Sequence, residues 1–118
     1  MSSSDCLFCK IVAGEIPADI VIETDKVIAF RDITPQAPTH VLIIPRKHIP
    51  TINDLQSGDA DEIGHLFLAA KAIAVQEGID DAGYRVAMNC NEAAGQTVFH
   101  LHLHIIGGRE FTEGRMVG

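Results

Sequence analysis

The most regular alternation of apolar and polar positions in the chain covers residues 99–105, where three histidines stand between apolar neighbours. A period of two is typical of a β-strand, in which successive side chains point to opposite faces. We therefore expect His100, His102 and His104 to lie on one face of a strand, each roughly 7 Å from the next. The opposite face is expected to enter the core, and it carries Phe99, Leu101, Leu103 and Ile105.

Four further segments have the β-branched and apolar composition of strands, and they cover residues 19–23, 26–30, 39–44 and 84–89. The first two are separated by a Thr-Asp pair that suits a tight hairpin turn. Two prolines within residues 31–38 prevent regular structure and keep that connection extended. Alternation along the third strand places His40, Leu42 and Ile44 on one face.

The remaining pattern predicts two helices. The longer begins at about residues 57–59 and ends near Gln76. Its core-facing positions recur at helical spacing and are Ile63, Leu66, Phe67, Ala70, Ile73 and Ala74. The shorter helix covers residues 5–12, with Asp5 as its N-cap and Gly14 after its end. Hairpins combined with a single crossover helix predict an α+β fold with a five-stranded, mainly antiparallel sheet.

Length and charge narrow the class of protein. A chain of 118 residues is expected to form a single domain with one hydrophobic core. Acidic residues outnumber basic ones by 16 to 9, which argues against a nucleic-acid or anionic-membrane surface. No signal peptide is visible, and the apolar runs are far shorter than the ~20 residues of a spanning helix. These features and an odd number of cysteines predict a cytoplasmic protein with reduced thiols. The glycine-rich residues 107–118 predict a loop or a partner-dependent arm.

The row of histidines suggests chemistry, because burying an imidazole costs free energy unless the ring is paired. A neutral histidine can attack phosphorus and form a phosphoramidate intermediate, which divides one difficult displacement into two easier ones. Histidines on the same face can then reach the phosphate oxygens or the leaving group. Gly95 permits close approach of a phosphate, and Gln96 and Thr97 supply N–H and hydroxyl donors.

Cys6 and Cys9 form a Cys-x-x-Cys pair with three readings: two half-buried small side chains, a redox pair, or half of a metal site. The redox reading is disfavoured because no strand leads into the motif. A zinc site needs two further ligands, for which His48 and His100 are the candidates.

The run His100-Leu101-His102-Leu103-His104-Ile105-Ile106 resembles the signature of the histidine-triad (HIT) nucleotide hydrolases and transferases. Nearly the whole chain is similar to the Hint branch of that family, the purine nucleoside phosphoramidases. This similarity is carried by Ile16-Pro17-Ala18, by the run from Phe30 to His40 that contains Asp-Ile-Thr-Pro-Gln-Ala-Pro-Thr-His, and by the run from Gly95 to His100.

The resemblance implies a role for each matching residue. His102 would be the nucleophile, His104 would contact the phosphate and the leaving group, and His40 would orient His102 from the neighbouring strand. Asn89 would lie at the phosphate with Gly95, Gln96 and Thr97, the last of which stands where the Hint proteins commonly have serine. Asp32 would accept hydrogen bonds from the ribose hydroxyls, and Phe30, Ile33 and Ile16 would enclose the purine. Ordinary core packing for Phe30 and Ile16, and an Asx turn for Asp32, remain the alternatives.

The same resemblance implies a structural zinc ion and a homodimer. The zinc would be held by Cys6, Cys9, His48 and His100, and would tie the first helix to the histidine strand. The acidic long helix and the fourth strand would form the dimer contacts. The predicted activity is hydrolysis of AMP or GMP conjugates. A dinucleoside-polyphosphate hydrolase, a nucleotidyltransferase or a nucleotide-binding interaction protein is the alternative.

Overall fold

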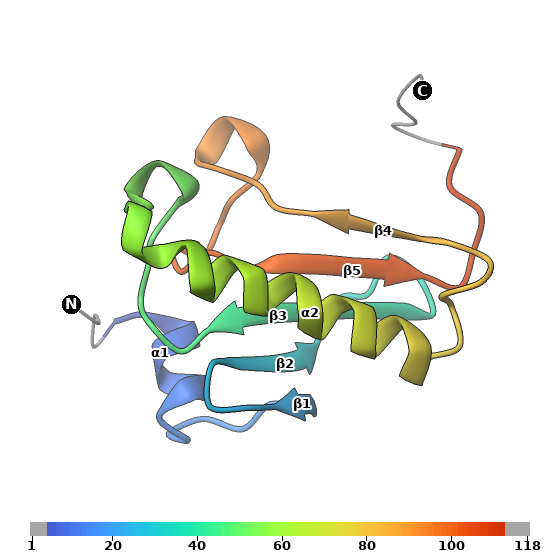
Figure 1. Cartoon of the computed structure of the whole chain (residues 1–118), viewed down its shortest axis with the longest axis horizontal. Coiled ribbons are helices and arrows are strands. Elements are labelled where there is room, and N and C mark those ends of the chain that lie inside the picture. The colour runs from blue at the N-terminus through green and yellow to red at the C-terminus, as the bar shows by residue number, and fades with distance from the viewer. Residues whose placement is uncertain (1–4, 113–118) are drawn as a thin grey trace.

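The computed structural model describes residues 5–112 and contains one five-stranded sheet with the strand order β1-β2-β3-β5-β4 (Figure 1). All four neighbouring strand pairs are antiparallel. The elements are α1 (Leu7–Val12), β1 (Ile20–Glu23), β2 (Val27–Arg31), β3 (Thr39–Pro45), α2 (Ala60–Gln76), β4 (Tyr84–Ala87) and β5 (Leu103–Gly107), with 3-10 turns at Ile52–Asp54, Ser57–Asp59 and Glu92–Ala94. This confirms the predicted α+β fold. No helix within residues 5–112 is long and apolar enough to cross a membrane.

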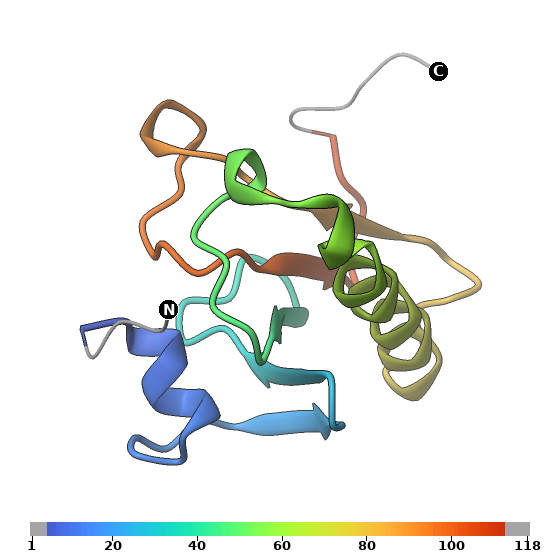
Figure 2. The same ribbon diagram turned by 60° about the vertical axis from the view of Figure 1, so that its left-hand side comes forward.

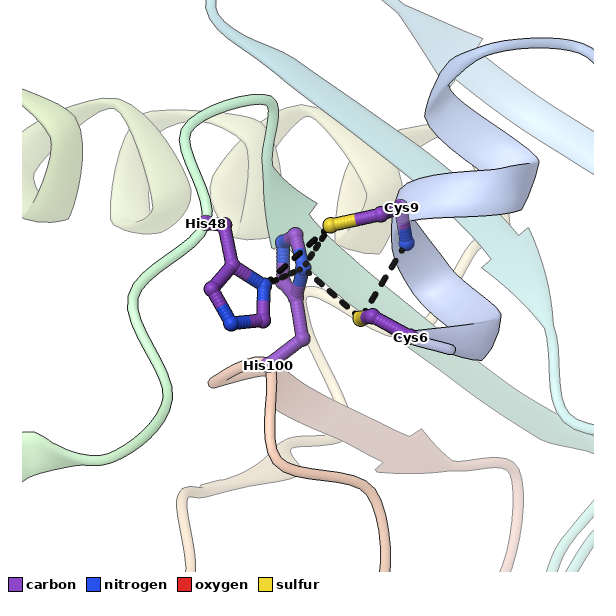
Figure 3. Close-up of side chains that lie close together, drawn as sticks. All are labelled: Cys6, Cys9, His48 and His100. Atoms are coloured by element: carbon purple, nitrogen blue, oxygen red, sulfur yellow. Dashed lines mark hydrogen bonds between the residues drawn. The ribbon is translucent and has the colours of Figure 1, made fainter. Parts of the chain in front are cut away.

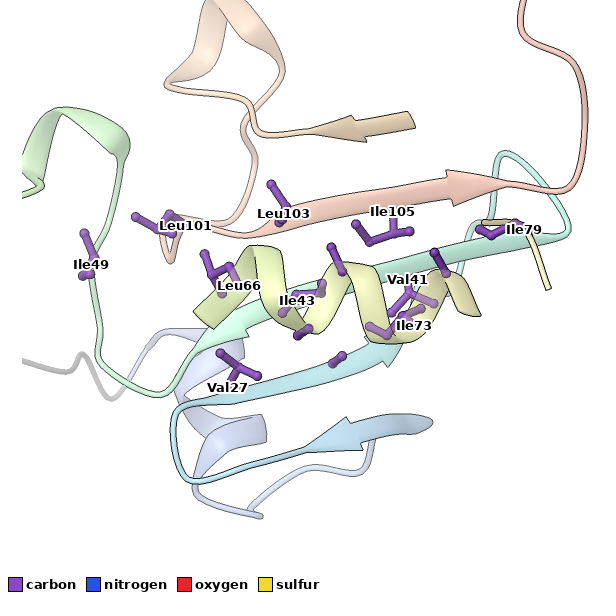
Figure 4. Packing of buried hydrophobic residues seen from close by; sticks show 14 residues of the cluster. Val27, Val41, Ile43, Ile49, Leu66, Ile73, Ile79, Leu101, Leu103 and Ile105 are labelled. Atoms are coloured by element: carbon purple, nitrogen blue, oxygen red, sulfur yellow. The ribbon is translucent and has the colours of Figure 1, made fainter. Parts of the chain in front are cut away.

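The helices lie on opposite sides of the sheet, as Figure 2 shows. The inner face of α2, which includes Leu66 and Ile73, packs on side chains of the central strands such as Val41, Ile43 and Ile105 to form the main core (Figure 4). A smaller apolar cluster on the other face has Phe8 of α1 against four buried strand residues: Ile28, Phe30, Leu42 and Ile44. Because side chains alternate along each strand, the strands contribute apolar residues to one core on each face of the sheet. On the face covered by α1, the ends of the strands remain available for polar groups.

The helix predictions need two corrections. The N-cap of α1 is Cys6, whose Sγ accepts a hydrogen bond from the Cys9 N–H at 3.3 Å, and not Asp5. Phe67, predicted to face the core, is 52% exposed because it lies outside the stripe of α2 that meets the sheet.

The strand containing the histidines is shorter than predicted. β5 begins at Leu103, so His100 and His102 lie in an irregular extended segment before it, and Phe99 is 42% exposed. The pairing with β3 ends at Ile43 and Leu103, two residues before β3 itself ends at Pro45. β4 likewise ends at Ala87 and not at residue 89. Of the predicted C-terminal arm, residues 113–118 lie outside the described part of the chain.

Candidate active site and metal centre

A pocket of about 550 Å³ lies on the α1 side of the sheet. It is bounded by α1, the segment before β1, the end of β2 and the loop before β5. Nine of the residues predicted to form the site line this pocket: Ile16, Phe30, Asp32, Ile33, Asn89, Gly95, Thr97, His102 and His104. Residues from distant parts of the sequence therefore line the same pocket.

His102 is held by the backbone of its own segment. Its Nδ1 lies 2.9 Å from the carbonyl oxygen of His100. A carbonyl oxygen can only accept, so Nδ1 carries the proton and Nε2 keeps a free lone pair. Burial lowers the pKa of His102, which favours the neutral ring. The side chain is thus prepared as a nucleophile through Nε2.

His40 contacts His104, and the prediction that it orients His102 is wrong. The backbone N–H of Gln36 donates to Nδ1 of His40 at 3.1 Å, so the proton of the neutral His40 ring is on Nε2. That Nε2 lies 3.0 Å from Nδ1 of His104, which must accept, and 3.4 Å from a carboxylate oxygen of Asp32. The proton of neutral His104 is consequently on its Nε2.

His104 is therefore a hydrogen-bond donor beside the pocket, whereas His102 is an acceptor there. Burial, together with the two neighbouring histidines, lowers the pKa of His104 to about 4. His102 and His104, whose ring centroids are 5.1 Å apart, thus have opposite tautomers. The His100 carbonyl, which can only accept, sets the tautomer of His102, and the Gln36 N–H, which can only donate, sets that of His104 through His40.

Asp32, His40 and His104 have side-chain atoms close enough together to hold a metal ion. The Nε2 proton of His40 instead explains this cluster as a hydrogen-bonded group. Asp32 also makes the Asx turn considered as its alternative role, because its Oδ1 accepts from the N–H and the hydroxyl of Thr34 at 2.8 and 3.1 Å.

Gln96 does not line the pocket, and its side chain holds the loop before β5. Its Oε1 accepts from the Asn91 N–H at 2.7 Å, and its Nε2 donates to the carbonyl oxygens of Pro50 and Val98 at 2.7 and 3.1 Å. Its own N–H bonds to the Asn91 carbonyl at 3.1 Å. The prediction that Gln96 supplies phosphate donors is therefore wrong. Gly95, with φ of +95°, adopts a backbone conformation that L side chains rarely take.

The apolar part of the pocket has a buried side and an open side. Phe30 is buried and packs on Phe8 with ring centroids 5.3 Å apart, so it also serves the core, as its alternative role proposed. Ile33 is 95% exposed at the pocket. An isoleucine this exposed gains nothing from folding, which is consistent with a side chain that is covered by a ligand.

Cys6, Cys9, His48 and His100 bring their ligand atoms to one point, within 4.8 Å of one another (Figure 3). Cys9 Sγ lies 3.1 Å from Nδ1 of His48 and 3.5 Å from Nδ1 of His100, and Cys6 Sγ lies 3.5 Å from the latter. The Nε2 of His100 donates to the Pro45 carbonyl at 2.8 Å, which leaves Nδ1 free to bind a metal.

Two thiols and two imidazoles without an open position are the donor set of a structural zinc site. These four residues therefore fit the ion that the sequence suggested. They come from α1, the loop after β3 and the segment before β5, so a bound ion would join three separate parts of the chain.

Several residues that line the pocket were missed from the sequence, and three of them, Leu7, Phe8 and Ile11, lie on α1. The Cys-x-x-Cys pair could have identified them, because these three residues lie within it or just after it. A metal that fixes the cysteines also fixes the residues between them.

Apolar walls that meet a few convergent polar groups, here one imidazole acceptor and one imidazole donor, are typical of a ligand-binding or active site. Comparison with known proteins gives the family: residues 13–111 match the HIT domain, and the chain belongs to the HIT family. It is 50% identical over 107 residues to the purine nucleoside phosphoramidase of Escherichia coli K12, which covers 91% of this chain and 90% of that protein.

Solved structures agree with this assignment. A HIT family hydrolase from Legionella pneumophila superposes with a TM-score of 0.91 at 52% identity, covering 93% of this chain and 98% of that one. A histidine triad protein from Clostridium difficile gives a TM-score of 0.93 at 41% identity, with 98% and 100% covered. Family membership, the fold and the hydrolase class predicted from the sequence are thereby confirmed.

Proposed function

We propose that this chain hydrolyses AMP or GMP conjugates at a phosphorus–nitrogen or similar bond, through a covalent nucleotide adduct on His102. The observation that carries the proposal is the pair of opposite tautomers on His102 and His104 beside one pocket. The 50% identity to an E. coli protein named purine nucleoside phosphoramidase supports the purine and the nitrogen leaving group.

In the first step, Nε2 of His102 attacks the α-phosphorus. A bond forms between this nitrogen and phosphorus while the bond to the leaving nitrogen breaks. The Nε2–H of neutral His104 donates a hydrogen bond to that nitrogen, which departs as the amine with a proton supplied by solvent. The adduct leaves His102 with a positive ring, which the hydrogen bond from Nδ1 to the His100 carbonyl stabilises. In the second step water attacks the same phosphorus, the bond from phosphorus to Nε2 of His102 breaks, the proton of the water passes to solvent, and His102 is released as the neutral Nδ1–H ring.

The nucleotide contacts follow from the pocket lining. Phe30, Ile33 and Ile16 would enclose the base, and the Asp32 carboxylate would accept from the ribose hydroxyls. Asn89, Gly95 and Thr97 would contact the phosphate. A zinc ion held by the two cysteines, His48 and His100 would have a structural role and would fix α1 against this pocket.

The activity is tested by turnover with three groups of substrates: AMP and GMP amine conjugates, dinucleoside polyphosphates, and nucleotide sugars. We expect the amine conjugates to give the highest kcat/KM. Preference for dinucleoside polyphosphates, or transfer of the nucleotide to an acceptor other than water, would support the alternative enzymes. Nucleotide binding with turnover near background would support an interaction protein.

The proposed role of His104 makes its loss depend on the leaving group. His104→Ala should reduce hydrolysis of an AMP–alkylamine conjugate strongly, because a poor leaving group depends on the hydrogen bond that Nε2–H of His104 donates to it. With a nitrophenyl ester of AMP, which leaves without such help, the loss should be about tenfold smaller. Equal losses of kcat with the two substrates would contradict a role of His104 at the leaving group.

A homodimer is also part of the proposal, and two features of the surface support it. The side of α2 that faces away from the sheet exposes Phe67, Leu68 and Val75, and β4 is an edge strand of the sheet. Exposed apolar side chains on a helix and an open strand edge are each typical of protein–protein contacts. The predicted cytoplasmic location stays a prediction.

Sedimentation should therefore give a species of twice the 12.7 kDa chain mass. Leu68→Glu should shift that species toward the monomer, whereas Ile52→Glu, at an exposed apolar position outside α2, should not. A single species near the mass of one chain for the unmodified protein would contradict the proposed homodimer.

A further inference from the structure

Phe8 occupies a position that neither the proposed reaction nor the metal site explains. It is the second residue of α1 and lies between the two metal-binding cysteines in the sequence, yet its ring points into the apolar cluster on the pocket side of the sheet. It is the only buried residue that the structure describes in α1.

The Phe8 ring meets the ring of the proposed nucleophile almost at right angles. The centroids of Phe8 and His102 are 5.1 Å apart with an interplanar angle of 85°, which is the edge-to-face geometry that aromatic pairs prefer. The same Phe8 ring lies 6.1 Å from the ring of His100, at 68°. Phe8 thus stands beside both a metal ligand and the nucleophile.

A single hydrogen bond does not fix the orientation of an imidazole. The bond from Nδ1 of His102 to the His100 carbonyl fixes one ring atom but allows the ring to tilt about the N–H···O axis. Two other rings, those of Phe8 and His104, lie beside it with centroid distances of 5.1 Å each. Together with the hydrogen bond they leave the His102 ring one orientation.

Phe8 can act in this way because its own position is determined by several contacts. A helix of six residues is not stable alone, so α1 is held by what it touches. Those contacts are the packing of Phe8 on Phe30, and the approach of the Cys6 and Cys9 thiols to the imidazoles of the metal site.

We propose that Phe8 is a positioning residue for the reaction, holding the His102 ring in the orientation from which Nε2 attacks. This inference rests on the proposed function, in which His102 is the nucleophile. Because a positioning residue affects the attack and not the binding of the nucleotide, its loss should lower kcat and leave KM nearly unchanged.

The experiment compares Phe8→Leu, which keeps apolar volume but removes the ring, with Val12→Ala. Val12 packs on the same apolar cluster from the same helix but does not line the pocket, so it is the matched control. We expect Phe8→Leu to lower kcat for an AMP–amine conjugate by about tenfold with KM changed less than about threefold. Val12→Ala should keep kcat within about twofold, since only general packing is lost.

A second readout needs no turnover. Two-bond 15N–1H correlations of the imidazole rings distinguish the Nδ1–H from the Nε2–H tautomer, and His102→Ala assigns the signals. The unmodified protein and Val12→Ala should show His102 as the Nδ1–H form with sharp ring signals. Phe8→Leu should keep this tautomer, because the hydrogen bond to the His100 carbonyl remains, but its His102 ring signals should be shifted and broadened because the ring can tilt. If Phe8→Leu lacks a cooperative melting transition, Phe8→Met, which fills the site with a flexible apolar chain, takes its place.

Three results would overturn the inference. An unchanged kcat in Phe8→Leu would contradict the positioning role. A rise of KM with no change in kcat would mean that Phe8 only lines the pocket. A loss of kcat in Val12→Ala equal to that in Phe8→Leu would indicate a general loosening of α1. Failure of the proposed function would look different, because His102→Ala would then keep its activity whatever Phe8 does.

Discussion

Replacing His102 with alanine should lower the turnover of an AMP–amine conjugate by several orders of magnitude, while AMP binds nearly as before. The change removes the atom that forms the new bond to phosphorus, and this interaction exists in the transition state and not in the ground state. The proposed base and ribose contacts from Phe30, Ile33 and Asp32 do not involve the His102 ring, so binding should persist.

The measurement is kcat under saturating substrate, with AMP affinity determined by calorimetry on the same preparations. His65→Ala is the matched control, because His65 lies on α2, is half-buried with Nε2 3.4 Å from a carboxylate oxygen of Asp61, and does not line the pocket. Its activity should equal that of the unmodified chain. If His102→Ala retains more than about a tenth of the activity, the assignment of the nucleophile is wrong.

Cys9→Ser should remove most of the bound zinc and lower the melting temperature substantially. Cys9 Sγ is close to both imidazoles of the metal site, and a serine hydroxyl does not replace a thiolate as a zinc ligand. Structural zinc in small domains contributes on the order of 10 kcal/mol of binding free energy at neutral pH. Losing only about 3 kcal/mol of stability would already lower Tm by about 10 °C.

Metal analysis of protein prepared from zinc-replete medium without chelator should find about one zinc ion per chain, and Cys90→Ser is the matched control. Cys90 is also a half-buried free thiol but lies outside the metal site, so this variant should keep its metal and its Tm. Zinc should also leave as the pH falls well below neutral, because the thiolates must be deprotonated and the imidazoles neutral to bind it. A metal-free chain with an unchanged Tm in Cys9→Ser would leave the cysteines as ordinary half-buried side chains.

The elements that follow from local patterns could be predicted from the sequence. Periods of two and 3.6 gave all five strands and α2, and they correctly placed His40, Leu42 and Ile44 together on the pocket side of the sheet. The sequence also placed Cys6, Cys9, His48 and His100 together, and the structure brings their ligand atoms close enough to hold a metal ion.

The partners of the histidines could not be predicted, because they depend on where strands end. The Pro45 carbonyl is available to accept from His100 because the pairing of β3 with β5 ends at Ile43, two residues before Pro45. His102 is oriented by a carbonyl two residues earlier, which a regular strand would have directed to its neighbour. Alternation along a sequence indicates which face a ring occupies, but gives no information on which backbone group meets its nitrogen.

The most direct test of the account is to identify the residue that carries the nucleotide during turnover. Enzyme mixed with an AMP–amine conjugate labelled in the adenine should be denatured within the first turnover at alkaline pH, because phosphorus–nitrogen bonds to histidine are labile in acid. Digestion and mass spectrometry should then locate AMP on His102. An adduct on His104 or His40, or release of labelled AMP with no covalent protein adduct when formation and breakdown are both resolved, would contradict the mechanism.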